Sequence, residues 1–310
     1  MTYIWLLSTS DAASPDEVQQ HLSNYLQDKH VLQVPEWLRA IVVWVLSRWH
    51  ARRLVPAYRQ LSGQTPLLDE MEQQARVLSR VLGARYQCRP VLYGGQPNAH
   101  KAAMEIGRGD RVILLPLEPQ RGTDLYASIA AAQRELEPRT DKIAVIPSYP
   151  THSGYIDVLS ETLRSGILDL PQKTPYEVVF ISIDPLTKMR AEQVGELHGT
   201  VQAVVDRVGL IMPHHLETLS ADGQRGSAIQ KIQQMGQRGQ AVVVVPVSVP
   251  FSRMALTVGI KSVLNQIAMS SGVTHFICGP QYGNRPTFTR TLWHLIQDAE
   301  MDAGWKEGTN

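Results

Sequence analysis

Short continuous runs of apolar residues recur along this 310-residue chain and constrain its fold more than any other feature. Runs in which apolar residues do not alternate with polar ones are typical of parallel β-strands covered on both faces. The sequence predicts eight such strands, at residues 3–8, 88–93, 111–117, 142–147, 177–183, 207–212, 241–249 and 274–278.

Helical patterns lie between these runs. Residues 66–83 place apolar side chains three and four positions apart and end at Gly83, and residues 153–167 have a similar spacing. Strands that alternate with helices indicate an α/β fold with parallel sheets.

The predicted strands form two groups of four, separated by the Pro-containing polar stretch 168–176. We therefore expect two Rossmann-like halves, residues 1–167 and 168–310, each a parallel four-stranded sheet flanked by helices. Ligands of such sheets bind beyond the carboxyl ends of the strands, so the expected site is an interdomain cleft.

The composition excludes several classes of function. A net charge of +1 provides no basic field for nucleic acid, and no nucleotide phosphate-binding motif is present. Two cysteines cannot form a disulfide framework and favour a reducing compartment. No apolar run is long enough to span a membrane. We expect a cytoplasmic protein that binds a small molecule. The sequence requires no cofactor, leaves a metal or a tetrapyrrole open as one, and indicates no oligomeric state.

Polar residues follow the predicted strands at their carboxyl ends, where the cleft should lie. We expect catalysis by acid–base chemistry from Asp184, Glu118 and Asp124. Asp184 could instead cap the following helix, and the other charges could be solvated loop residues. The expected substrate-binding residues are Arg121, Ser182, Arg253, Ser252, Tyr93 and Trp44.

Residues 35–54 form a helical pattern that is rich in tryptophan and arginine, with Trp37, Trp44 and Trp49 among its apolar positions. Tryptophan and arginine on one amphipathic helix suit either a membrane interface or the lip of an apolar pocket. A core helix of a large domain would have a similar pattern. The helix is therefore our candidate for peripheral contact with a membrane.

The segment MPHHLETLS (212–220) contains the chain's most compact group of metal-binding residue types. On a helix, His214 and Glu217 would share one face, whereas His215 would point elsewhere, and no third ligand is evident. We therefore predict no metal site and keep His214, His215 and Glu217 as weak candidates.

Five motifs in the first half resemble those of the ferrochelatases, in the same order. They are WLLSTSDAASPDEVQQHLSNYLQD (5–28), AYRQLSGQTPLLDEMEQQA (57–75), VLYGGQPN (91–98), VILLPLEPQ (112–120) and SYPTHSGYIDVLSETLR (148–164). The second half is similar through EVVFISIDP and AVVVVPVSVPF. The resemblance implies two Rossmann-like halves around a deep cleft and the insertion of ferrous iron into protoporphyrin. In that reaction the porphyrin is distorted and loses two pyrrole protons, which a neutral His and a carboxylate can accept.

The chain departs from the family pattern at the residues that perform this chemistry. The position of the family's catalytic His matches Ile183, and that of its catalytic Glu matches Ala255. Arg253 stands where the family often has His, and Glu118 where it has Tyr. Residues 9–15 replace its opening Gly-Gly-Pro.

An isoleucine cannot accept a proton, and an alanine cannot bind iron. We therefore expect a ferrochelatase-like enzyme with a rebuilt cleft and a diverged active site that acts on another small molecule. The alternatives are a chelatase with relocated ligands, and a non-catalytic tetrapyrrole-binding protein or partner subunit.

Overall fold

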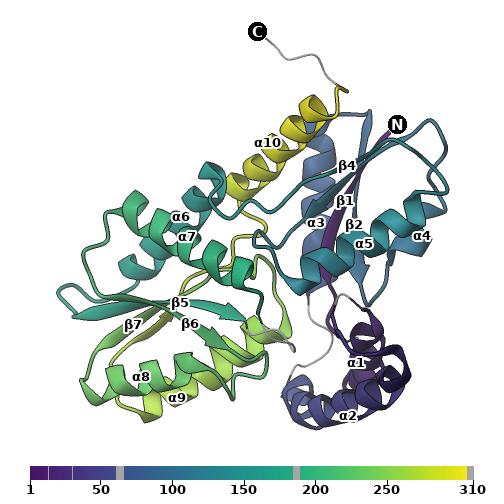
Figure 1. Cartoon of the computed structure of the whole chain (residues 1–310). Coiled ribbons are helices and arrows are strands. Elements are labelled where there is room, and N and C mark those ends of the chain that lie inside the picture. The colour runs from purple at the N-terminus through teal and green to yellow at the C-terminus, as the bar shows by residue number, and fades with distance from the viewer. Residues whose placement is uncertain (13, 30, 61–65, 184–188, 306–310) are drawn as a thin grey trace.

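The computed structural model describes residues 1–12, 14–29, 31–60, 66–183 and 189–305, and within them the chain forms two parallel four-stranded sheets (Figure 1). The sheets have the same topology, β2-β1-β3-β4 and β6-β5-β7-β8. The predicted α/β class and the two parallel sheets are thus confirmed. The strands are β1 (Thr2–Thr9), β2 (Tyr86–Tyr93), β3 (Arg111–Pro116), β4 (Ile143–Val145), β5 (Tyr176–Ile183), β6 (His214–Leu219), β7 (Ala241–Pro246) and β8 (Phe276–Cys278).

One predicted strand is wrong. Residues 207–212 begin in the last turn of a helix that ends at Val208, and Gly209 closes that helix in a left-handed conformation. The strand of this region is β6, which starts at His214. The prediction failed because residues 207–212 contain a short apolar run, whereas the strand itself contains two histidines and a glutamate.

Helices cover both faces of each sheet and the edge where the strands end. They are α1 (Val18–Gln27), α2 (Glu36–Gln60), α3 (Leu67–Leu82), α4 (Ala99–Ala103), α5 (Thr123–Leu136), α6 (Ser153–Leu168), α7 (Ala191–Val208), α8 (Ser227–Gln237), α9 (Asn265–Ser270) and α10 (Pro286–Asp302), with a 3-10 turn η1 (Pro15–Glu17) and a π-helix η2 (Ala255–Leu264).

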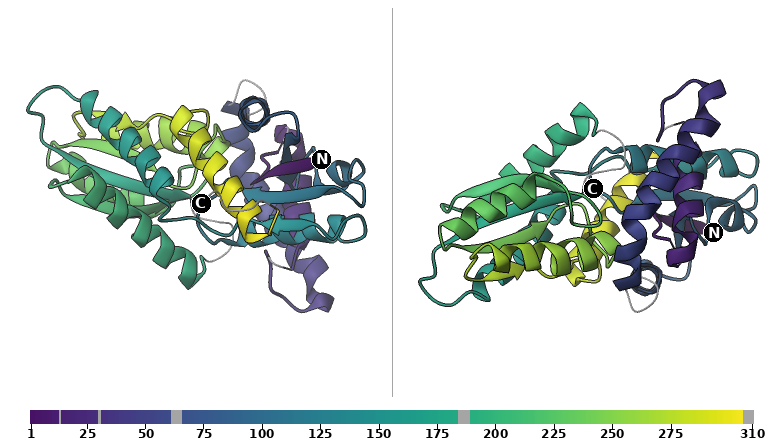
Figure 2. Two further views of the ribbon diagram at one scale, coloured as in Figure 1. Left: turned by 90° about the horizontal axis from the view of Figure 1, so that it is seen from above. Right: turned by 90° about the horizontal axis from the view of Figure 1, so that it is seen from below.

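Two helices cross between the halves. Helix α6 precedes the linker but packs on β7 and β8 of the second sheet, and α10, at the end of the second half, packs on α3, β3 and β4 of the first. The two views in Figure 2 show α10 lying across the junction. The boundary expected at residue 168 therefore separates the strands of the two sheets, whereas α6 and α10 each pack against the other half.

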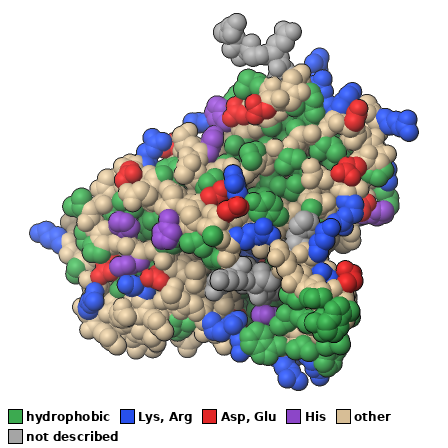
Figure 3. All heavy atoms as spheres, viewed as in Figure 1, with side chains coloured by type: hydrophobic (Ala, Val, Ile, Leu, Met, Phe, Trp, Pro, Cys, Tyr) green, Lys and Arg blue, Asp and Glu red, His purple; other side chains and the backbone are tan. Residues whose placement is uncertain are grey.

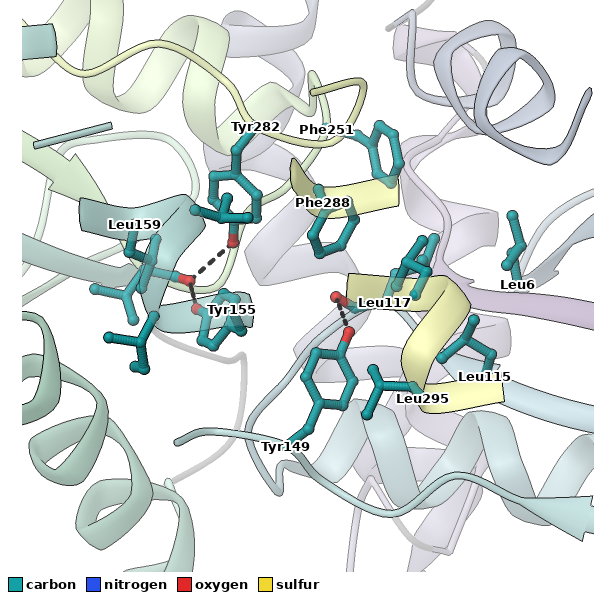
Figure 4. Close-up of a cluster of buried hydrophobic side chains, with 14 of the residues drawn as sticks. Leu6, Leu115, Leu117, Tyr149, Tyr155, Leu159, Phe251, Tyr282, Phe288 and Leu295 are labelled. Carbon is teal, nitrogen blue, oxygen red and sulfur yellow. Dashed lines mark hydrogen bonds between the residues drawn. The ribbon is translucent and has the colours of Figure 1, made fainter. Parts of the chain in front are cut away.

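A continuous core also joins the halves (Figure 4). It runs from Leu6 and Leu115 of the first sheet to Phe180 and Val243 of the second. Aromatic rings fill the space between them, and the hydroxyl groups of Tyr155 and Tyr282 both donate to the carbonyl oxygen of Val247. Tyr149 packs edge-on against Tyr155 and donates to the carbonyl oxygen of Pro116 at the end of β3. Because protein cores are close-packed, these rings hold the ends of β3 and β7 close together.

Helices α1 and α2 pack together as a separate layer beneath the first sheet (Figure 1). They lie at the side where β1 and β3 end, and α2 also contacts η2 of the second half. This layer forms one wall of the candidate site.

Candidate active site

A pocket lies between the two halves at the carboxyl ends of their strands, where the sequence predicts the cleft. Its empty space, including the part open to solvent, is ≈ 1170 Å³. The walls are mostly apolar, and the polar groups converge at the strand ends. The described lining residues that carry the argument are Ser10, Asp11, His21, Tyr25, Glu118, Asp124, Ser182, Ile183, Arg253 and Ala255.

An ionic cluster occupies the floor of this pocket and joins the two halves. The Arg253 Nη1 atom lies 3.2 Å from Glu118 Oε1, and its Nε lies 3.8 Å from Asp11 Oδ1. Ser8 donates a hydrogen bond of 2.8 Å to Glu118 Oε1, and the Met254 N–H donates one of 3.0 Å to Asp11 Oδ2. We call Asp11, Glu118 and Arg253 the floor cluster.

Burial and pairing set the charges of the floor cluster. Burial raises the pKa of Glu118, against the opposing effects of Arg253 and of the hydrogen bond from Ser8. Burial alone would lower the pKa of Arg253, but Asp11 and Glu118 outweigh it and raise that pKa. Arg253 is therefore permanently positive, whereas Glu118 is a carboxyl group that exchanges a proton nearer to neutral pH than an exposed glutamate would.

Asp124 lies in the first turn of α5 and accepts a hydrogen bond from the Tyr25 hydroxyl. Burial and the adjacent Asp124 raise the pKa of Tyr25 well above its ordinary value, so this tyrosine stays protonated and donates. Acidic residues favour the amino end of a helix because of its dipole. Asp124 is thus held as an acceptor at the pocket wall.

Two buried hydroxyl groups at the strand ends have no hydrogen-bond partner within the described part of the chain. They belong to Thr9 at the end of β1 and Ser182 near the end of β5, and both residues line the pocket. A buried hydroxyl group without a hydrogen-bond partner costs folding free energy, and a ligand that bonds to these two hydroxyls would offset that cost.

The predicted site residues divide into those that meet at the pocket and those that do not. Glu118, Asp124, Ser182 and Arg253 line it together. Asp184 lies outside the described residues, as does the neighbouring Lys188.

Two of the residues predicted to bind substrate are bonded to other side chains outside the pocket. Arg121 is half-exposed and pairs with Glu196 at 3.1 Å. Ser252 donates from its backbone and its hydroxyl to Glu70 of α3, and it accepts from Gln281. Neither residue is among those that line the pocket.

Tyr93 and Trp44 also lie away from the pocket lining. The Tyr93 hydroxyl bonds to Asp28, and the Tyr93 ring packs edge-on against Tyr25. Tyr93 therefore contacts a residue that lines the pocket but does not line it itself. Trp44 points outward from α2 and is 59 % exposed.

None of the three weak metal candidates lines the pocket, and His214 and His215 lie at the amino end of β6. Residues 214–219 form β6, so His214 and Glu217 point to opposite faces. His215 Nε2 lies 2.8 Å from Glu177 Oε2. Among the described residues, no three His, Cys, Asp or Glu side chains gather as a metal-binding group.

His21 and Asp11 are pocket residues that we did not predict. His21 lies on α1, four residues before Tyr25, so both side chains share the helix face that lines the pocket. That spacing is visible in the sequence and could have identified the pair. Asp11 belongs to the segment that replaces the family's Gly-Gly-Pro, but its pairing with Arg253 depends on the contact between the halves.

Comparison with known proteins identifies the family. The family model described as ferrochelatase matches residues 4–300. The chain belongs to the ferrochelatase family. A ferrochelatase of Synechococcus elongatus is 25 % identical over 95 % of this chain and 81 % of its own length, and one of Citrifermentans bemidjiense is 24 % identical over 96 % and 98 %.

Solved structures of chelatases share the fold. SirB from Bacillus subtilis with Fe³⁺ has a TM-score of 0.52 at 9 % identity and aligns with 98 % of each chain. CbiX, the terminal enzyme of sirohaem biosynthesis in denitrifying bacteria, has a TM-score of 0.52 at 8 % identity over 96 % of this chain and 98 % of its own. At such low identity, the likeness to SirB and CbiX shows the fold alone.

The two residues that we expect at the positions of the family's catalytic His and Glu both face the pocket. Ile183 and Ala255 both line it, from the end of β5 and the start of η2. Their aliphatic side chains provide no proton acceptor, so acid–base chemistry in this pocket falls to the other ionisable residues that line it.

Helix α2 presents an apolar stripe to solvent on the side away from the pocket. Leu54 and Tyr58 line the pocket, and the Tyr58 hydroxyl accepts a hydrogen bond from the Ala12 N–H. The exposed apolar residues of α2 are Trp37, Ile41, Trp44, Val45 and Trp49. Figure 3 shows a green, hydrophobic region at the lower right, in the part of the molecule where Figure 1 places α2. No helix in the described ranges has the length and apolar character that crossing a bilayer requires.

Proposed function

We propose that this protein is a chelatase that acts on a tetrapyrrole and uses relocated proton acceptors, chiefly Glu118, in place of the family's His and Glu. The observation that carries this proposal is the floor cluster. Three separate departures from the family pattern, at Asp11, Glu118 and Arg253, meet in one ionic contact inside the pocket. Such a joint replacement supports a rebuilt site rather than the loss of one.

The electrostatics of the pocket suit this chemistry. Metal insertion requires groups that accept the pyrrole protons, and a glutamate whose pKa is raised by burial is a stronger base than an exposed one. The carboxyl groups of Asp11, Glu118 and Asp124 outnumber the single guanidinium among the described lining residues, and this balance favours the metal cation that is to be inserted. The apolar walls fit the face of a macrocycle.

A second candidate function is acid–base catalysis on another small molecule, without iron insertion. Arg253 favours it, because a permanent positive charge inside the pocket, at a position where the family often has His, repels a divalent metal. The same carboxyl group, Glu118, would then transfer the proton.

The test uses zinc and mesoporphyrin as probes. We expect the wild-type protein to insert zinc, measured by the fluorescence of the zinc porphyrin, and to shift the porphyrin Soret band on binding. A Soret shift without turnover would replace the proposal with a non-catalytic tetrapyrrole-binding protein. Neither signal at micromolar protein would reject both tetrapyrrole functions and leave the second candidate.

We further propose that α2 attaches the protein to an anionic membrane surface through its exposed stripe. Arg48 and Arg52 of the same helix are exposed, so that cationic groups lie near the apolar side chains. Tryptophan with arginine on one helix is the combination that lies in a membrane interface.

The double change Trp37→Glu/Trp44→Glu is expected to weaken binding to vesicles that contain phosphatidylglycerol by about tenfold or more, because each ring loses a buried position in the interface. Co-sedimentation with the vesicles measures this effect. Ile211→Glu is the matched control, since Ile211 is 95 % exposed but lies far from α2 in the chain. Equal binding of the double variant and the wild type would contradict membrane attachment through α2.

A further inference from the structure

A second cavity adjoins the candidate active site and is separated from it by α1. It lies between α1 and the loop after β2, and its lining includes the polar side chains of Glu17, Gln20, Asn24 and Asn98. Three residues, Ser10, Asp11 and His21, line both this polar cavity and the main pocket. The imidazole of His21 therefore stands at the junction of an apolar site and a polar exit.

We propose that His21 accepts the second proton of the reaction and releases it to water in the polar cavity. This inference rests on the proposed function, because metal insertion into a porphyrin releases two protons and Glu118 accounts for one of them. The first pyrrole N–H bond breaks as Glu118 gains a proton, and the second breaks as an N–H bond forms on His21. The metal forms its bonds to the four macrocycle nitrogens, and the imidazolium and the carboxyl group of Glu118 then each lose a proton to water.

The hydrogen bonds of His21 fix the tautomer that this role requires. Nδ1 lies 3.1 Å from the carbonyl oxygen of Gly94, which can only accept, so Nδ1 carries the hydrogen. The Nδ1–Cε1 edge of the ring faces Gly94, and Cε1 would lie 3.5 Å from a side chain placed there. Nε2 therefore keeps a lone pair that can accept a proton.

The charges around His21 allow it both to accept and to release the proton. Burial lowers the pKa of His21, and the nearby Arg253 lowers it further, while Asp11 and the hydrogen bond to Gly94 raise it. The imidazole is therefore neutral at neutral pH. Glu17, which lines the polar cavity, adds a negative charge on the exit side.

Three variants test this inference in the zinc–mesoporphyrin assay. His21→Ala is expected to lower kcat by about tenfold or more, and added imidazole is expected to restore part of the loss. His21→Asn keeps a donor for the Gly94 carbonyl but has no base, so it should be as slow as His21→Ala if the role is proton transfer. His198→Ala on the exposed face of α7 is the control and should match the wild type.

The pH dependence distinguishes a proton acceptor from a structural residue. In the wild type, kcat is expected to rise with pH as His21 loses its proton. The part of the kcat–pH profile that His21 causes should be absent in His21→Asn. If His21→Asn keeps the wild-type rate and pH profile, the inference is wrong while the chelatase proposal stands. If the wild type inserts no zinc, the chelatase proposal itself fails.

Discussion

Glu118→Gln is expected to lower the rate of zinc insertion into mesoporphyrin by about 100-fold or more, in line with the usual contribution of general acid–base catalysis. Glutamine keeps the size of the side chain and an oxygen that can accept from Ser8 and Arg253. It cannot accept a proton. The change therefore removes the base and leaves the neighbouring hydrogen bonds in place.

The pH profile provides a second measure of the same residue. Because burial raises the pKa of Glu118, its carboxylate form exists only above that raised pKa. The wild-type rate should accordingly increase with pH through this value, and Glu118→Gln should lack this part of the increase while it keeps the part that belongs to His21. Glu105→Gln is the matched control, since Glu105 pairs with Arg89 at an exposed site. A Glu118→Gln protein as fast as this control would exclude Glu118 as the proton acceptor.

The architecture of this chain could be predicted because its strands are continuous apolar runs. In a parallel sheet covered on both faces, the strand needs no contribution from distant residues to be recognisable, as β1 and β7 illustrate. β6 escaped prediction because its six residues include His214, His215 and Glu217, which are partly exposed. The local pattern cannot reveal a strand that takes its place through pairing with β5.

The sequence predicts those site residues whose positions are determined by the end of a strand. Glu118 and Arg253 follow β3 and β7, which are interior strands of the two sheets, and both residues line the pocket. Asp11 escaped prediction for a different reason, because its pairing with Arg253 depends on how the loop before α1 packs against the second half. The four-residue spacing of His21 and Tyr25 was visible in the sequence, but the local sequence does not specify which surface that helix face covers.

Arg253→Met is expected to lower the free energy of unfolding by about 3–5 kcal/mol, because it leaves two buried carboxyl groups without their cation. The side chains of Arg253, Asp11 and Glu118 are only 18 %, 12 % and 16 % exposed, so solvent screens their interactions little. The carboxyl groups come from the first half of the chain and the guanidinium from the second. The loss should therefore weaken the contact between the halves as well as the site.

Chemical denaturation of the single and double variants measures this contribution. Glu118→Gln/Arg253→Met should recover part of the lost stability, since it also removes one of the unpaired carboxyl groups, and the double-mutant cycle gives the coupling energy. Arg76→Met is the control. Its exposed pair with Glu72 should be worth less than about 0.5 kcal/mol. If Arg253→Met were as stable as Arg76→Met, the floor cluster would be a solvated group of charges, and the structural argument for a rebuilt site would fail with it.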